Sequence, residues 1–231
     1  YGLVGSEMCI RDSINSAKNE ETDDWWNGMN RLYNVFCYDY LYPNPKSVMA
    51  FIENHDTDRF LGEGKDTVAL KQALALLLTI NRTPQLYYGT EVLMNGTKSV
   101  TDGNVRKDFP GGWAGDKHNA FTEEGRTQDE NQMFQWLSNL LHWRQGNKVV
   151  TKGKQTQFCP YKGVYVIARQ YQGKTVMTII NGKKEANELD VTRYAEIIGS
   201  HEKATDVTNG CTVLINKNVK LRPRQTMILE F

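Results

Sequence analysis

The spacing of the apolar residues changes near residue 150, and this change constrains the fold more than any other feature of the sequence. Before it, apolar residues recur at three- and four-residue steps, as in residues 128–145, which is typical of helices. After Lys154 they alternate with polar residues or form short β-branched runs, as in 176–180, which is typical of strands. We therefore expect an α/β part over residues 14–149 and a separate all-β domain over residues 150–231.

The α/β part contains a strand, a helix and a second strand. The apolar run over 47–52 indicates a strand buried on both faces. Asp66 and Thr67 can cap a following helix, and a second strand is expected over 85–88. Two strands joined by a helix are parallel, with a right-handed crossover. The loops that follow the two strands should therefore lie at the same edge of the sheet.

A loop as long as the one expected over 90–127 is usually functional in a compact domain. The other expected features are a helix over 14–42 ended by Pro43 and Pro45, a helix over 128–145, a boundary at 148–153, strands at 164–167, 212–215 and 226–229, and turns at Asn181-Gly182 and Asn209-Gly210.

The first 13 residues, YGLVGSEMCIRDS, show neither a helical nor a strand period, and they lack the layout of a signal peptide. They resemble a translated sequencing adapter. We expect residues 1–13 to be foreign to the protein, and genomic DNA that encodes them in frame would contradict this.

The overall charge excludes two classes of partner. The 231 residues include 28 Lys and Arg against 27 Asp and Glu, so a net charge of +1 offers no field for nucleic acid or an anionic membrane. The longest apolar run, near 73–78, is far below the roughly 20 residues that cross a bilayer.

Aromatic residues make up 10% of the chain, which suits amphipathic ligands such as sugars. The four cysteines show no C-x-x-C spacing and imply no disulfide framework.

The segment FIENHDTDR, residues 51–59, places carboxylates and an imidazole at the end of the first strand. An Asp there can simply cap a helix, and a lone His can be structural, so catalytic and structural interpretations are both open. Glu53, His55 and Asp56 lack a third converging His or Cys, so no metal site is expected. The chain has no G-x-S-x-G, G-x-x-x-x-G-K-[ST] or G-x-G-x-x-G motif of hydrolases and nucleotide-binding proteins.

Several motifs in order along the chain resemble one enzyme family. FIENHD and, one strand-helix step later, PQLYYGTEVLM (84–94) are similar to the last two barrel strands of glycoside hydrolase family 13, the α-amylase family. DGNVR (102–106) is similar to an Asp-x-x-x-Arg pair after the eighth strand. RKDFPGGW (106–113) and NAFTEEGRT (119–127) resemble the neopullulanase and cyclomaltodextrinase branch, particularly its bacterial extracytoplasmic members.

This resemblance implies the C-terminal part of a (β/α)8 TIM barrel, about its last two strand-helix units, followed by an antiparallel β-sandwich domain. It also implies a retaining hydrolase of α-1,4-glucosidic bonds, whose substrates are maltooligosaccharides, cyclodextrins or pullulan. Asp56 corresponds to the catalytic carboxylate that stabilises the transition state. His55, Asp102 and Arg106 correspond to residues that bind the sugar.

The nucleophile and the acid/base of the family belong to strands that would precede Ile14, so we expect the chain to be a C-terminal fragment that is inactive alone. Glu53 should not be taken for the missing nucleophile. Arg59 and Glu91 fit supporting salt bridges equally well. Trp113 either stacks on a sugar or anchors its loop.

In the alternative to an enzyme, the barrel part is a degenerate, non-catalytic remnant, and two roles stay open for the β domain. It would be a carbohydrate-binding module if Tyr161, Tyr165 and Tyr171 formed an exposed aromatic face; otherwise it supports the barrel, which we favour. No cofactor is expected in this chain, although many relatives use calcium through ligands that would lie upstream. The resemblance implies a periplasmic or otherwise extracytoplasmic location, and it leaves the oligomeric state open.

Overall fold

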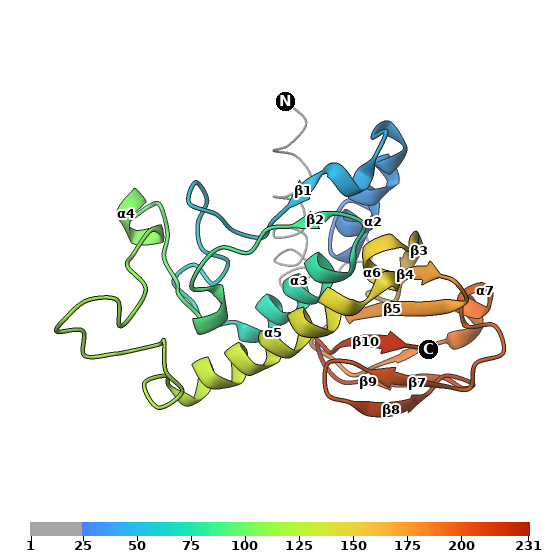
Figure 1. Ribbon diagram of the computed structural model, residues 1–231. Helices are drawn as coiled ribbons and strands as arrows, with labels where there is room; N and C mark the ends of the chain where they lie inside the picture. The colour runs from blue at the N-terminus through green and yellow to red at the C-terminus, as the bar shows by residue number, and fades with distance from the viewer. Residues whose placement is uncertain (1–24) are drawn as a thin grey trace.

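The computed structural model describes residues 25–231. A helical part and a β-sheet part lie side by side, and the long loop around α4 extends away from both (Figure 1). The expectation for residues 1–13 and the first half of the helix expected over 14–42 lie outside the described residues.

The helical part runs from Met29 to Lys152. Its elements are α2 (Met29–Cys37), η1 (Tyr38–Leu41), η2 (Pro45–Ser47), β1 (Met49–Ala50), α3 (Thr67–Thr79), β2 (Thr83–Pro84), η3 (Thr90–Val92), α4 (Asp102–Val105), α5 (Gln128–Gly146) and α6 (Lys148–Lys152). The expected helix therefore ends as an α-helix at Cys37, and a tighter 3-10 turn replaces its last residues. The expected boundary at 148–153 is occupied by the short helix α6.

The two strands of the helical part are parallel, as predicted, but much shorter. β1 and β2 pair Met49 with Thr83 and Ala50 with Pro84. The strand expected over 85–88 is wrong in position, because the ladder continues only to the bond from the Gln85 amide to the Ala50 carbonyl, at 2.7 Å. Burial on both faces is also wrong, since Met49 is exposed while Ala50 is buried.

Two long helices, α3 and α5, begin at side-chain caps. The Asp66 carboxylate accepts the Ala69 amide at 3.0 Å, as the sequence predicts for α3. Val68, an apolar residue in the first turn of α3, is exposed. Thr127 and Glu130 form a reciprocal capping box at the start of α5. The cap fixes the point at which the long loop rejoins the helical part.

The β part is an antiparallel domain, as predicted. Its strands are β3 (Lys154–Tyr161), β4 (Val164–Tyr171), β5 (Lys174–Asn181), β6 (Asn187–Leu189), β7 (Lys203–Asp206), β8 (Cys211–Leu214), β9 (Val219–Leu221) and β10 (Thr226–Glu230), with the short helices η4 (Val191–Tyr194) and α7 (Ala195–Ile198). Six strands form one sheet in the order β3-β4-β5-β10-β7-β8, and β6 pairs with β9.

The turns of this domain follow the sequence only in part. The expected turn at Asn209-Gly210 does connect β7 to β8. A two-residue hairpin between β4 and β5 uses Gln172 and Gly173, which the sequence analysis did not select. Both have positive φ, 51° and 78°, the pattern of a two-residue hairpin turn.

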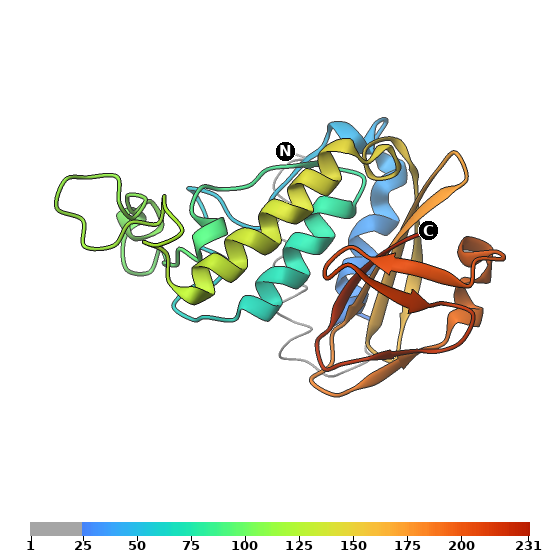
Figure 2. The same ribbon diagram turned by 60° about the horizontal axis from the view of Figure 1, so that its bottom comes forward.

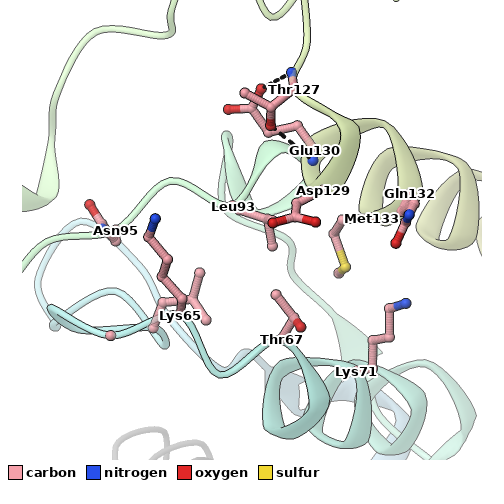
Figure 3. Close-up of a pocket in the computed structure, with 12 residues that line it drawn as sticks. Lys65, Thr67, Lys71, Leu93, Asn95, Thr127, Asp129, Glu130, Gln132 and Met133 are labelled. Atoms are coloured by element: carbon pink, nitrogen blue, oxygen red, sulfur yellow. Dashed lines mark hydrogen bonds between the residues drawn. The ribbon is translucent and has the colours of Figure 1, made fainter.

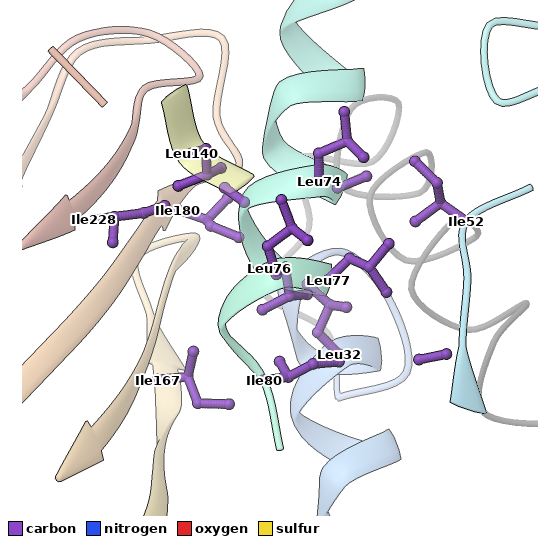
Figure 4. Close-up of a cluster of buried hydrophobic side chains, with 14 of the residues drawn as sticks. Leu32, Ile52, Leu74, Leu76, Leu77, Ile80, Leu140, Ile167, Ile180 and Ile228 are labelled. Carbon is purple, nitrogen blue, oxygen red and sulfur yellow. The ribbon is translucent and has the colours of Figure 1, made fainter. Parts of the chain in front are cut away.

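One hydrophobic core joins the two parts. Side chains of α3 and α5 meet one face of the sheet, and Figure 4 labels Leu76, Leu140, Ile167, Ile180 and Ile228 in that cluster. The opposite face packs against a second cluster that includes residues of β6 and β9. Both faces of β4 are therefore buried, which the alternating pattern did not predict. Figure 2 shows the long helices lying against the sheet.

Buried polar bonds connect the same two parts. The Arg169 guanidinium of β4 donates to the carbonyls of Thr79, at 3.1 Å, and Gly153, at 2.7 Å. The Gln72 amide of α3 donates to the Asn181 carbonyl at 2.9 Å. Because these donors are buried, they would lose their partners if the sheet separated from the helices.

Candidate active site

The segment after β1 presents His55 and Asp56 at the surface. The Asn54 side chain accepts the Asp56 amide at 2.9 Å, and the Asn54 amide donates to the Thr57 hydroxyl at 3.0 Å. These local bonds form a tight turn directly after the strand. The imidazole of His55 lies 3.1 Å from a carboxylate oxygen of Asp56, and both side chains are exposed.

Arg106 brings the second predicted pair of residues to this turn. Its Nη2 lies 3.2 Å from Asp56 Oδ1 and 3.7 Å from Asp102 Oδ2, and its Nε donates to the His55 carbonyl at 2.9 Å. The hydroxyl of Thr101 caps α4, which places Asp102 and Arg106 one helical turn apart. All four residues proposed from the sequence therefore lie in one group, called here the Asp56 cluster.

Lys98 is a further member of the Asp56 cluster that the sequence analysis missed. Its Nζ lies 3.4 Å from Asp102 Oδ1 and donates to the Asp56 carbonyl at 3.3 Å. Its backbone amide donates to Asp58 Oδ1 at 2.6 Å. The spacing of four residues between Lys98 and Asp102 was the signal available in the sequence.

The Asp56 cluster combines two carboxylates, two cations and an imidazole in an exposed position. The Asp56 and Arg106 side chains are 62% and 43% exposed, and ion pairs with such exposure add little to stability. Water solvates these groups in the free protein, and a polar ligand can replace it. The arrangement can accept hydrogen bonds through its carboxylates and donate them through Arg106 and Lys98, which suits a ligand rich in hydroxyl groups.

Glu53, three residues before Asp56, has a different environment. Its side chain is 3% exposed and pairs with the fully buried Arg59 at 3.5 Å. It also accepts the Phe60 amide and the Thr90 hydroxyl. Burial raises the pKa of the Glu53 carboxyl, against the opposing effects of Thr90, Phe60 and Arg59. Its partners fill its acceptor sites inside the protein, so Glu53 supports the loop.

Arg59 supports the loops around the site through an ion pair, hydrogen bonds and a cation–π contact, in line with the salt-bridge role that the sequence left open. Besides Glu53, it donates to the carbonyls of Tyr88, at 2.6 Å, and Val105, at 3.1 Å. Its guanidinium carbon lies 3.9 Å from the centre of the Tyr87 ring. Glu91 forms no ion pair with any residue from 25 to 231. Arg59 thus ties the turn after β1 to the loops after β2.

A separate pocket of about 300 Å³ lies between the beginnings of α3 and α5. Figure 3 shows Lys65, Lys71 and Asp129 among its lining residues. None of the residues of the Asp56 cluster lines it. The pocket is therefore distinct from the candidate active site.

Three further features concern other classes of site. Residues 25–231 contain no group of three or more His, Cys, Asp or Glu side chains that could hold a metal ion. Within the same range, no helix has the length and apolarity needed to cross a membrane. Cys37, Cys159 and Cys211 are free and exposed.

Comparison with known proteins identifies the class. Residues 155–230 match the family model of the cyclo-malto-dextrinase C-terminal domain. The chain is 32% identical to the cyclomaltodextrin glucanotransferase of Geobacillus stearothermophilus, a match that covers 80% of the chain and 23% of that relative. It is 30% identical to the maltogenic α-amylase of Bacillus acidopullulyticus, over 83% of the chain and 31% of that relative.

A solved structure is similar over nearly the whole chain. The crystal structure of the α-amylase from Geobacillus thermoleovorans, complexed with acarbose, aligns with a TM-score of 0.73 at 21% identity, covering 97% of this chain and 46% of that one. This structural similarity shows the fold, and the sequence matches show that the chain belongs to the α-amylase family, glycoside hydrolase family 13, as its motifs predicted. The chain spans about a quarter of the length of the first two curated relatives, 23% and 24%.

Proposed function

We propose that this chain supplies the transition-state carboxylate and part of the sugar-binding site of a retaining α-glucan hydrolase. The observation that carries the proposal is the convergence of Asp56, His55, Asp102 and Arg106 at the turn after β1, although the sequence separates the two pairs by about 50 residues. Membership of the α-amylase family supports a sugar as the ligand.

Each residue of the Asp56 cluster has a role in this proposal. The Asp56 carboxylate accepts hydrogen bonds from two sugar hydroxyls, and these bonds strengthen as the ring flattens toward an oxocarbenium-like transition state. His55 donates to a neighbouring hydroxyl of the same sugar. Asp102 and Arg106 bind the adjacent ring edge, with Lys98 holding Asp102 in position. Because Arg106 contacts both carboxylates, it also holds Asp56 and Asp102 at a fixed separation.

The proposal assigns only one of the three carboxylates that the reaction needs. Retaining hydrolysis uses a nucleophile and an acid/base about 5 Å apart. No carboxylate here is assigned either role, and Glu53 is unsuited because its acceptor sites are occupied inside the protein. We therefore propose that β1, α3 and β2 belong to the final units of a (β/α)8 barrel in a longer enzyme. On this account the chain alone has no turnover.

The finer substrate assignment rests on sequence motifs. RKDFPGGW and NAFTEEGRT favour a neopullulanase or cyclomaltodextrinase that cuts α-1,4 bonds in maltooligosaccharides, cyclodextrins or pullulan. Transglycosylation is the alternative, because the named relatives include both glucanotransferases and amylases. An extracytoplasmic location is part of the same proposal and rests on the same motifs.

A supporting role is proposed for the β domain. Tyr165 and Tyr171 do not form the exposed aromatic face that a carbohydrate-binding module would need, because Tyr165 is fully buried and Tyr171 packs against the shared core. Only Tyr161 of the three is exposed, and Arg193 lies over its ring at 4.3 Å. These three tyrosines therefore do not support a carbohydrate-binding module, while the core contacts of the domain with α3 favour stabilisation of the barrel.

The test compares two variants in the longer enzyme. Asp56→Asn keeps the size of the side chain and should lower turnover of maltoheptaose by about two orders of magnitude or more, the scale of losing a transition-state charge contact. Lys65→Gln, in the separate pocket, is the control and should leave turnover within about twofold. Near-normal turnover of Asp56→Asn would contradict the proposal. Released reducing sugar is the readout, and circular dichroism checks the fold.

A further inference from the structure

Trp113 presents an apolar surface to solvent in a fixed orientation. The residue is 67% exposed and lies in the loop that follows Arg106. Its indole Nε1 donates to Asp108 Oδ2 at 3.0 Å, and its backbone amide donates to Asp116 Oδ2 at 3.2 Å. The one polar atom of the side chain is thus satisfied within the loop, and the surface left to a ligand is the apolar face of the ring.

The loop around Trp113 is braced although it lies on the surface. The Gly111 amide donates to the same Asp116 oxygen at 2.9 Å. Gly111 has a φ of 95°, and a Cβ there would lie 2.3 Å from the Asn119 side chain, so the two arms of the loop touch. The rings of Phe109 and Phe121 pack with their centres 4.6 Å apart. Binding to a braced surface costs less ordering entropy than binding to a loose one.

The groups beside the indole indicate the chemistry of the ligand. Asp108 and Asp116 each use Oδ2 within the loop, and their Oδ1 atoms accept no hydrogen bond from residues 25–231. An aromatic face flanked by exposed carboxylate acceptors fits a pyranose ring, which has a C–H face and hydroxyl groups at its edge. The centre of a protein interface is instead depleted of aspartate.

Trp113 follows Arg106 of the Asp56 cluster in the same loop. The two residues are seven positions apart, and seven extended residues span at most about 25 Å. The start of the loop is fixed, because the Tyr88 hydroxyl donates to the Lys107 carbonyl at 2.7 Å. Figure 2 shows the loop projecting beyond the helices, away from the sheet. A sugar chain seated on the Asp56 cluster can extend along this loop.

We propose that Trp113 is a stacking platform for an outer sugar unit of a long α-glucan chain, with Asp108 and Asp116 accepting its hydroxyls. The inference rests on the proposed function, which it extends from the sugar at Asp56 to a more distant one. It predicts that Trp113 favours long substrates over short ones, because only a long chain reaches it.

Calorimetric titration of the whole chain with maltoheptaose and with maltose tests the proposal. Trp113→Ala should weaken maltoheptaose binding about tenfold, equivalent to about 1.4 kcal/mol, and leave maltose binding unchanged. Trp113→Phe keeps a ring but loses the bond to Asp108, and it should retain affinity within about threefold of the unmodified chain, or about 0.6 kcal/mol. Trp26→Ala is the matched control, since Trp26 is equally exposed, at 67%, before α2. It should bind both sugars normally.

The outcomes separate this inference from the proposed function. Normal maltoheptaose binding by Trp113→Ala overturns the inference, and so does an equal loss for both sugars, which would indicate a distorted loop. Loss of self-association in Trp113→Ala with sugar binding intact would overturn it in favour of a protein contact. If Asp56→Asn binds both sugars normally while Trp113→Ala loses maltoheptaose, the proposed function fails and the platform stands. Absence of sugar binding by the unmodified chain overturns both.

Discussion

Two carboxylates three residues apart, Glu53 and Asp56, each pair with an arginine, yet the two pairs have opposite environments. Glu53 and Arg59 are 3% and 0% exposed, whereas Asp56 and Arg106 are 62% and 43% exposed. The buried pair joins the turn after β1 to the loops after β2, and its remaining bonds are to protein atoms. In the exposed pair each carboxylate oxygen of Asp56 has one protein partner, Arg106 or His55, and the carboxylate stays open to solvent. One segment therefore supplies both the support of the site and the groups left available for a ligand.

The pairs also differ in what their removal should cost. A buried pair gives little net stability, but breaking it leaves an isolated charge in the interior. An exposed pair is solvated before and after its loss. Stability measurements should therefore respond to the Glu53–Arg59 pair, and ligand binding should respond to the Asp56 cluster.

The largest expected effect is on stability, from Arg59→Met. This change leaves the Glu53 carboxylate buried without its cation and removes the bonds to Tyr88 and Val105, so we expect a loss of about 3–5 kcal/mol. Urea unfolding at pH 7 measures it. The double variant Glu53→Gln, Arg59→Met should recover part of the loss, because no charge is then left unpaired. A loss below about 1 kcal/mol in the single variant would contradict the supporting role of the buried pair.

The next effect is on binding, from Arg106→Ala. Loss of a guanidinium that contacts both Asp56 and Asp102 should weaken maltose binding about tenfold, or about 1.4 kcal/mol. Unfolding free energy should change by no more than about 0.5 kcal/mol, as for other exposed positions. Lys107→Ala, one residue along the same loop, is the control for binding. Equal weakening in both variants would mean that the loop, and not the guanidinium, is responsible.

A smaller expected effect is the pH dependence of the stability that Glu53 contributes. Because burial raises the pKa of the Glu53 carboxyl, the stability that this group contributes is fully present below the unfolded value of about 4.3. It is lost as the pH rises through the higher folded value. The stability of the unmodified protein relative to Glu53→Gln should therefore fall as the pH rises from about 4 toward neutrality. Urea midpoints measured across that range check this, and a relative stability that rises with pH would contradict it.

The smallest effect concerns salt. Asp56→Asn removes an exposed ion pair, so its effect on unfolding free energy should be at most about 0.5 kcal/mol at low salt and should vanish near 1 M salt, where the Debye length is about 3 Å. Arg59→Met should keep most of its effect under the same conditions, because a buried pair is poorly screened. If both variants respond alike to salt, the distinction between the pairs fails.

The sequence predicted those parts of the molecule that depend on local chemistry. Asp66 could be recognised as the cap of α3 because the residues of a cap are close in the sequence. The position of Asp56 after a parallel strand, and its approach to Asp102 and Arg106, followed from the rule that loops gather at one edge of such a sheet. The four proposed site residues therefore lie together as expected.

The features that the sequence did not predict depend on tertiary contacts. The short β1 and β2 reflect how few neighbouring strands the described residues provide, which no local pattern records. Tyr165 is buried because α3 and its neighbours cover one face of β4, and an alternating pattern could not show that both faces of this strand are covered. Lys98 joins the Asp56 cluster through backbone atoms of a distant turn. The sequence could not decide whether Trp113 stacks on a sugar or anchors its loop, because that choice depends on its exposure and on its bond to Asp108.

Nuclear magnetic resonance of the chain during a maltose titration tests the central claim most directly. The Arg106 Nε–H and His55 imidazole signals report on the Asp56 cluster, and the Arg59 Nε–H signal reports on the buried pair. The account predicts that the first two shift with a common saturation curve, that the Arg59 signal stays in place, and that Asp56→Asn abolishes the shifts. Sugar binding that moves none of the Asp56 cluster signals, or binding that Asp56→Asn leaves intact, would contradict it.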